Sequence, residues 1–80
     1  MTTAELQDLV RARELAASGG ARVIRETNGL SLHEVGQVVG VAPSTVLRWE
    51  RGNHRPRGRA AVQWVRLMRE LPVAMPDAVT

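Results

Sequence analysis

Apolar residues recur along this chain at the three- and four-residue spacing of one helix face, and no segment alternates as a half-buried strand does. Glycine and proline interrupt the pattern, because both residues are unfavourable inside a helix. We therefore expect an all-α protein, with five helices over residues 3–17, 21–28, 31–40, 43–52 and 58–71.

Local signals support several of these boundaries. Thr2 with Glu5, and Ser31 with Glu34, have the spacing of a capping box, in which two side chains satisfy the free amides of a helix start. Pro43 suits a first helical turn, where no backbone donor is needed. These signals predict where the first, third and fourth helices begin.

The apolar spacing also assigns the faces that should turn inward. In the first helix Leu15 lies off the expected stripe, which consists of Leu6, Leu9, Val10 and Ala16 or Ala17. In the last helix the inward positions are Ala61, Trp64, Val65, Met68 and Leu71.

Positive charge is concentrated in one short segment. The chain has a net charge of +3 from eleven basic residues, all of them arginine. Residues 48–59 hold five of these arginines against Glu50 alone, a local net charge of +4. Such a patch is typical of proteins that bind polyanions. The alternative is a solvated loop in a protein with an arginine-rich composition.

Other residue types narrow the function classes. Cysteine is absent, which removes disulfides, thiolate metal sites and cysteine nucleophiles. The two histidines, His33 and His54, have no repeated spacing with acidic residues, so we expect no metal and no cofactor. No apolar run is long enough to span a membrane. The sequence therefore favours a small, soluble, intracellular domain without enzymatic activity.

The most informative stretch is LHEVGQVVGVAPSTVLRWER, residues 32–51. Two short helices joined by a tight turn must cross steeply, which requires a very small residue at the crossing and a turn residue that tolerates positive φ. Gly36 and Gly40 stand at these two places. The apolar positions expected to fill the space behind them are Val35, Val39, Val41, Val46 and Trp49.

With GLSLHEVGQVVGVAPSTVLRWERG followed by NHRPRG, residues 21–71 resemble the helix-turn-helix domain of phage repressor and Cro proteins, the XRE family. The resemblance implies a compact five-helix bundle of the lambda-repressor-like type, here with an extra N-terminal helix. The expected division is an N-terminal helix and bend over 1–20, a helix-turn-helix DNA-binding domain over 21–71 and a flexible tail over 72–80. The extra helix either packs on the core or supplies a dimer surface.

The family's second motif helix enters the DNA major groove, where base pairs show distinct donor and acceptor patterns. The resemblance therefore implies base contacts from Pro43, Ser44, Thr45, Leu47 and Arg48. It implies phosphate contacts from Ser31, Leu32, Arg51, Asn53, Arg55, Arg57 and Arg59. It also implies double-stranded DNA as the partner, a homodimer on DNA, and a cytoplasmic protein that is nucleoid-associated when bound.

Two further expectations concern the support of this helix. The family often links an arginine to the glutamate that ends the recognition helix, here Arg25 and Glu50. Ala42 departs from the usual Ser or Thr, so the helix lacks its side-chain N-cap. Trp49 and Trp64 share the helical phase of the apolar residues, which favours core positions over stacking platforms for single strands.

Three functions from different classes remain open at this point. The first is a transcriptional regulator of the Cro or repressor kind. The second is a phage excision or architectural factor that uses the same motif to bend DNA. The third is an antitoxin-type module in which the free helix binds a protein partner.

Overall fold

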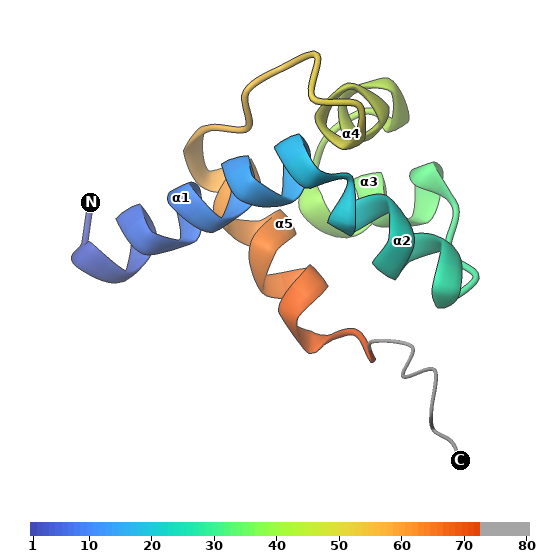
Figure 1. Cartoon of the computed structure of the whole chain (residues 1–80), viewed down its shortest axis with the longest axis horizontal. Coiled ribbons are helices and arrows are strands. Elements are labelled where there is room, and N and C mark those ends of the chain that lie inside the picture. Colours follow the sequence, from blue (N-terminus) through green and yellow to red (C-terminus); the bar gives the residue numbers. More distant parts are fainter. Residues whose placement is uncertain (73–80) are drawn as a thin grey trace.

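The computed structural model describes residues 1–72. Its helices are α1 (Thr3–Ser18), α2 (Gly20–Thr27), α3 (Leu32–Val39), α4 (Pro43–Glu50) and α5 (Gly58–Glu70) (Figure 1). The described part of the chain contains no strand, so the all-α prediction is confirmed. The tail predicted over residues 72–80 lies outside the described residues, except for Pro72.

Both predicted capping boxes form. The Thr2 hydroxyl accepts from the Glu5 amide at 3.1 Å, and the Glu5 carboxylate accepts from the Thr2 amide at 2.9 Å. At the start of α3 the same exchange joins Ser31 and Glu34 at 3.0 and 2.8 Å. Because these bonds satisfy amides that a helix start leaves free, α1 and α3 begin where the sequence indicates.

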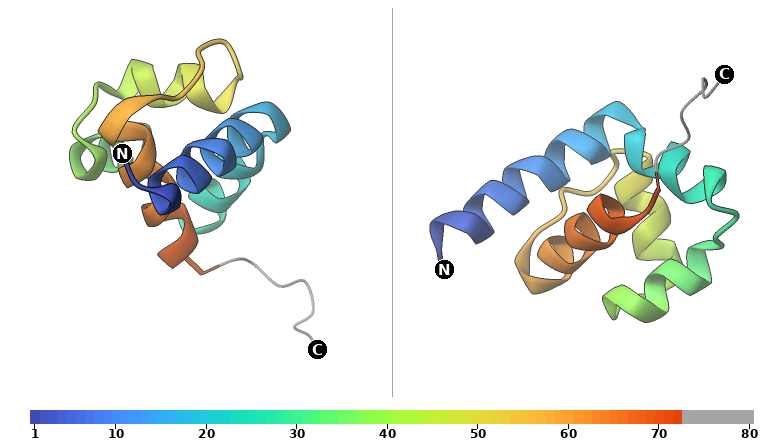
Figure 2. Two further views of the ribbon diagram at one scale, coloured as in Figure 1. Left: turned by 90° about the vertical axis from the view of Figure 1, so that its left-hand side faces the viewer. Right: turned by 90° about the horizontal axis from the view of Figure 1, so that it is seen from below.

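The core lies around Trp64, which is fully buried on α5. Trp49 of α4 packs against it with ring centroids 4.9 Å apart, so both tryptophans are core residues as predicted. Helix α5 lies between α1 and α3 and packs against both (Figure 2). The prediction for α5 is confirmed at Ala61, Trp64, Val65 and Met68, with Leu71 half-buried at its end.

The stripe predicted for α1 is wrong in part. Leu6 and Val10 are 53% and 55% exposed, whereas Leu15, expected off the stripe, is buried. The buried face is centred instead on Ala12, which is 0% exposed. Asp8 on the same face bonds to two arginines of α5. These contacts fix the rotation of α1 about its own axis, and Leu6 and Val10, on the adjacent face, stay in solvent.

The Asp8 carboxylate accepts hydrogen bonds from Arg69 at 2.7 Å and Arg66 at 3.2 Å. The hydrogen bond from Arg69 is the largest cause that lowers the pKa of Asp8 below its ordinary value. Burial opposes this effect, and the hydrogen bond from Arg66 adds to it. Together with the apolar contacts of Leu9, Leu15 and Ala16, these bonds dock α1 on the core. Of the two roles considered for this helix, packing on the core is the one that the structure shows.

Candidate nucleic-acid interface

The corner between α3 and α4 depends on two glycines, as predicted. Gly40 ends α3 with φ +86°, a conformation that side chains disfavour. Its amide and that of Val41 both donate to the Gly36 carbonyl, at 2.7 and 3.0 Å. A Cβ on Gly36 would stand 2.6 Å from the Val41 carbonyl oxygen. The Val41 carbonyl oxygen, which leaves no room for a Cβ at position 36, therefore belongs to the turn itself.

Helix α4 has a buried face and an exposed face. Val46 is 0% and Trp49 5% exposed, and both belong to the core. Pro43, Ser44 and Arg48 are exposed, while Thr45 and Leu47 lie half-buried on either side. The residues predicted to contact bases thus lie on the exposed face and its two edges.

The N-terminus of α4 has the missing cap that the sequence indicates. Ala42 makes no side-chain hydrogen bond, although its extended backbone (φ −67°, ψ 150°) is that of an ordinary N-cap residue. Its carbonyl accepts from the Thr45 and Val46 amides at 2.9 and 3.3 Å. Pro43 occupies the first turn, so the helix start is set by proline and backbone alone.

The C-terminus of α4 is held from behind by the predicted ion pair. Arg25 Nε donates to Glu50 Oε2 at 2.6 Å, and its second terminal nitrogen donates to Oε1 at 3.0 Å. The third guanidinium bond goes to the Leu30 carbonyl at 2.9 Å. The side chains are only 12% and 1% exposed, and the bond to Glu50 raises the pKa of Arg25 further. The pair therefore ties α4 to α2 and to the loop before α3.

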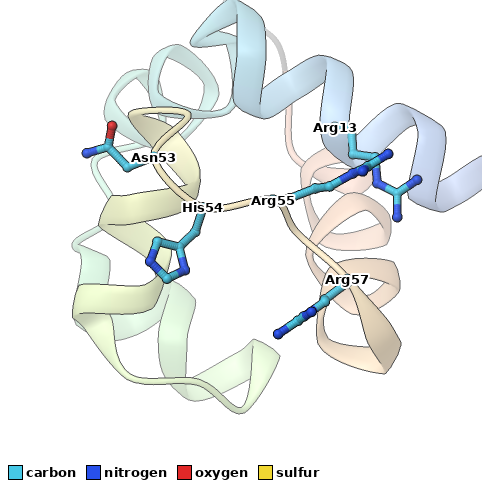
Figure 3. A pocket seen from close by; sticks show the side chains of 5 residues that line it. All are labelled: Arg13, Asn53, His54, Arg55 and Arg57. Atoms are coloured by element: carbon cyan, nitrogen blue, oxygen red, sulfur yellow. The ribbon is translucent and has the colours of Figure 1, made fainter.

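The segment after α4 gathers several of the predicted phosphate contacts. Gly52 turns the chain with φ +73°, and Pro56 is buried, so the loop is anchored while its polar side chains face outward. The loop borders an open hollow of about 430 Å³, which Figure 3 shows between the loop and α1. Its lining residues are Arg13, Asn53, His54, Arg55 and Arg57.

The other predicted phosphate contacts lie apart from this hollow. Arg51 borders a second depression beside α2, together with Arg22 and Leu47. Arg59 is exposed in the first turn of α5. The structure therefore spreads the basic segment over more than one surface.

The start of α3 is less open to phosphate than the sequence suggests. The Ser31 amide donates to the Glu34 carboxylate, which lowers the pKa of that carboxyl, and the Ser31 hydroxyl accepts from the Glu34 amide. Leu32 is half-buried and packs against the core. A phosphate at this helix start would have to displace a carboxylate, so a contact through Leu32 is easier to make than one through Ser31.

Sequence reasoning missed Arg13, which α1 places beside the loop. A signal was available: on a helix, residues three and four positions apart are neighbours, and Arg13 has only Leu9, Val10, Ala16 and Ala17 at those positions. Arg11, two residues earlier, pairs instead with Glu14 at 3.4 Å. An arginine without acidic neighbours on its helix was thus visible, but its distance from the loop was not.

His33 and His54 are both exposed. Within residues 1–72, no three histidine, cysteine or acidic side chains lie together as metal ligands would. No described helix combines the length and apolar character needed to cross a membrane.

A steep α3–α4 corner, an exposed second helix and a basic loop behind it define a helix-turn-helix protein of the DNA-binding class. The chain matches the helix-turn-helix domain family over residues 4–70, and it belongs to that family. The match confirms the helix-turn-helix assignment, is consistent with the resemblance to XRE and Cro proteins, and extends over α1. No curated protein and no solved structure matches the chain.

Proposed function

We propose that this protein is a sequence-specific regulator of transcription that binds double-stranded DNA through α4. The observation that carries the proposal is the division of α4 between Val46 and Trp49, which hold it to the core, and Ser44 and Arg48, which face solvent. An exposed helix of this kind fits the major groove, and the Arg25–Glu50 pair holds it in one orientation.

Arg48 is the proposed main base reader, because a guanidinium makes two parallel hydrogen bonds to a guanine edge. Ser44 lies on the same exposed face and donates to a base or a phosphate. Leu47 offers an apolar contact to a thymine methyl group. Pro43 and Thr45 flank these residues and complete the proposed base-contacting set.

Phosphate contacts fix the register of such a helix on the duplex without reading sequence. Asn53, Arg55 and Arg57 are proposed for this role because they line one basic hollow directly after α4. One helix reads few base pairs, so we propose a homodimer on paired half-sites about one DNA turn apart. Occupying a promoter requires no catalytic group.

Selection of binding sites from random duplex DNA tests the proposal directly. The expected product is a short motif, repeated in inverted orientation if the protein binds as a dimer. Arg48→Ala should lose about 1–3 kcal/mol of specific binding and relax one position of that motif. Arg57→Ala should weaken binding to all sequences and lower the salt slope by about 1.

The two variants are matched, since each removes one exposed arginine. If Arg48→Ala selects the same motif as the parent with equal stringency, Arg48 does not read bases. If the parent protein selects no motif and binds no duplex at low salt, the proposed function is wrong.

A further inference from the structure

The hollow between α1 and the loop after α4 is lined by three arginines from two distant parts of the chain. Arg55 and Arg57 come from the loop, and Arg13 comes from the middle of α1. In Figure 3, the side chains of Arg13 and Arg55 lie together beside α1, while Arg57 and His54 extend from the loop away from that pair. Within residues 1–72 the lining holds no carboxylate.

Arg13 differs from the arginines that stabilise the fold. Arg25, Arg66 and Arg69 all donate to buried carboxylates. The Nε of Arg13 is buried and has no hydrogen-bond partner among the described residues. A buried donor without an acceptor destabilises the folded state, and placing guanidinium groups together adds repulsion. An anion that enters the hollow offsets the repulsion between the guanidinium groups.

The backbone explains how α1 reaches the loop. A Cβ on Gly52 would stand 3.3 Å from the Ala16 carbonyl oxygen, so the loop leaves α4 in close contact with the last turns of α1. Arg13 lies three residues before Ala16 on that helix. The contact therefore places an α1 side chain next to the segment that follows the proposed recognition helix.

We propose that Arg13 joins Arg55 and Arg57 in holding one backbone phosphate of the bound duplex, outside the base pairs that α4 contacts. The guanidinium fork matches phosphate oxygens, and several forks around one open hollow suit a tetrahedral anion. The imidazole of His54 supplies a further N–H donor at its edge. This inference rests on the proposed function, because it assigns the phosphate to DNA.

The test compares Arg13→Met with Arg11→Met in binding to the selected duplex over a range of salt concentrations. Methionine keeps an unbranched apolar stem and removes the charge. Arg11 is the matched control, since it lies on the same helix, is 59% exposed and does not line the hollow. Arg13→Met should weaken binding roughly five- to tenfold, as expected for one partly solvated charged hydrogen-bond donor.

The salt dependence supplies a second readout. Arg13→Met should lower the log–log salt slope, but by less than the roughly 0.9 of a whole phosphate contact, because Arg55 and Arg57 stay on the phosphate. Arg11→Met should keep the parent slope. Arg13→Lys should restore the slope but only part of the affinity, because lysine keeps the charge and loses the fork. The selected motif should be the same in all of these variants, since a phosphate contact carries no sequence information.

Thermal melting separates this role from a structural one. Arg13→Met should melt at or above the parent temperature, because it removes an unpartnered donor, whereas loss of a structural contact would lower the melting temperature. Titration with inorganic phosphate identifies the source of the anion. If phosphate stabilises the parent but not Arg13→Met, while both bind DNA equally, the hollow takes a free anion and the DNA assignment is overturned.

The remaining outcomes distinguish the two proposals. If Arg13→Met and Arg11→Met bind the duplex with the same affinity and salt slope, the phosphate contact is refuted and the role of α4 stands. If the parent binds no duplex, both proposals fall together.

Discussion

Replacing Glu50 with alanine would leave the Arg25 guanidinium largely enclosed and without its hydrogen-bonded carboxylate, with the exposed Glu26 carboxylate still 3.9 Å away. The two bonds that this change removes are 2.6 and 3.0 Å long, and the two side chains are 12% and 1% exposed. Removing one partner of a buried ion pair costs about 3–5 kcal/mol, because the other charge remains desolvated. A chain of this size has a total stability of roughly 4–12 kcal/mol. Glu50→Ala should therefore lose a large part of it.

The chain offers a matched control in a second arginine–glutamate pair. Arg22 Nε lies 3.0 Å from Glu26, a similar distance, but these side chains are 63% and 52% exposed. Exposed helix pairs of this spacing contribute only about 0.3–0.5 kcal/mol. Arg22→Ala breaks only this exposed pair and leaves the 3.9 Å contact of Glu26 with Arg25 in place, so it should change stability several-fold less than Glu50→Ala. Burial, rather than the presence of an ion pair, is the source of the expected difference.

A double variant tests the same reasoning in the opposite direction. Replacing a buried pair with apolar residues of similar volume is often neutral or stabilising, since no charge is left without a partner. Arg25→Met with Glu50→Leu should therefore recover most of the loss of Glu50→Ala. The Leu30 carbonyl loses its donor in this variant, which limits the recovery.

Urea unfolding followed by tryptophan fluorescence measures these differences, because Trp49 and Trp64 pack together in the core. The comparison requires equal m-values, so that the midpoint reports stability. Equal losses for Glu50→Ala and Arg22→Ala would refute the reasoning. A double variant no more stable than Glu50→Ala would also refute it.

Three other substitutions follow from the packing and the pKa shifts. Trp49→Ala should cost about 3–5 kcal/mol, a large part of the total stability, and the melting temperature measured by circular dichroism should fall accordingly. Gly36→Ala should cost about 1–3 kcal/mol, because the Val41 carbonyl has to move, and a chemical denaturation curve measures the loss. The pKa of Asp8 is lowered in the folded state, so its carboxylate stabilises the fold at pH values above its ordinary pKa of 3.8. This contribution disappears as the pH falls through the folded-state pKa. Asp8→Asn should flatten this part of the melting temperature's acid dependence; an unchanged acid limb would contradict the role of Asp8.

The parts of the fold that local chemistry determines could be predicted from the sequence. Capping boxes, the proline of α4 and the positive-φ glycine at 40 depend on neighbours a few residues away, and the helix bounds agree with the prediction to within two residues. The corner between α3 and α4 could be predicted equally well, because Gly36 and the Val41 carbonyl that it faces belong to one short motif. The exposed face of α4 followed from the same spacing.

The rotation of α1 could not be predicted, because it depends on contacts between the ends of the chain. Asp8 meets Arg66 and Arg69 at sequence separations of 58 and 61 residues. The apolar residues of α1 extend beyond the face that is buried, so periodicity alone allowed the stripe through Leu6 and Val10. The position of Arg13 beside the loop is a consequence of the same docking.

The arginines of this domain differ in the source of their counter-charge. This difference determines whether each contributes to the stability of the fold or to the affinity for DNA. Arg25, Arg66 and Arg69 are balanced by carboxylates of the chain, so their interactions form on folding. Arg13, Arg55 and Arg57 line a hollow whose described lining has no carboxylate. In the proposed complex a DNA phosphate supplies the counter-charge, and the counterions that the DNA releases make binding favourable and salt-dependent. Charge removal in the first group should therefore lower the melting temperature, and in the second group the affinity for DNA.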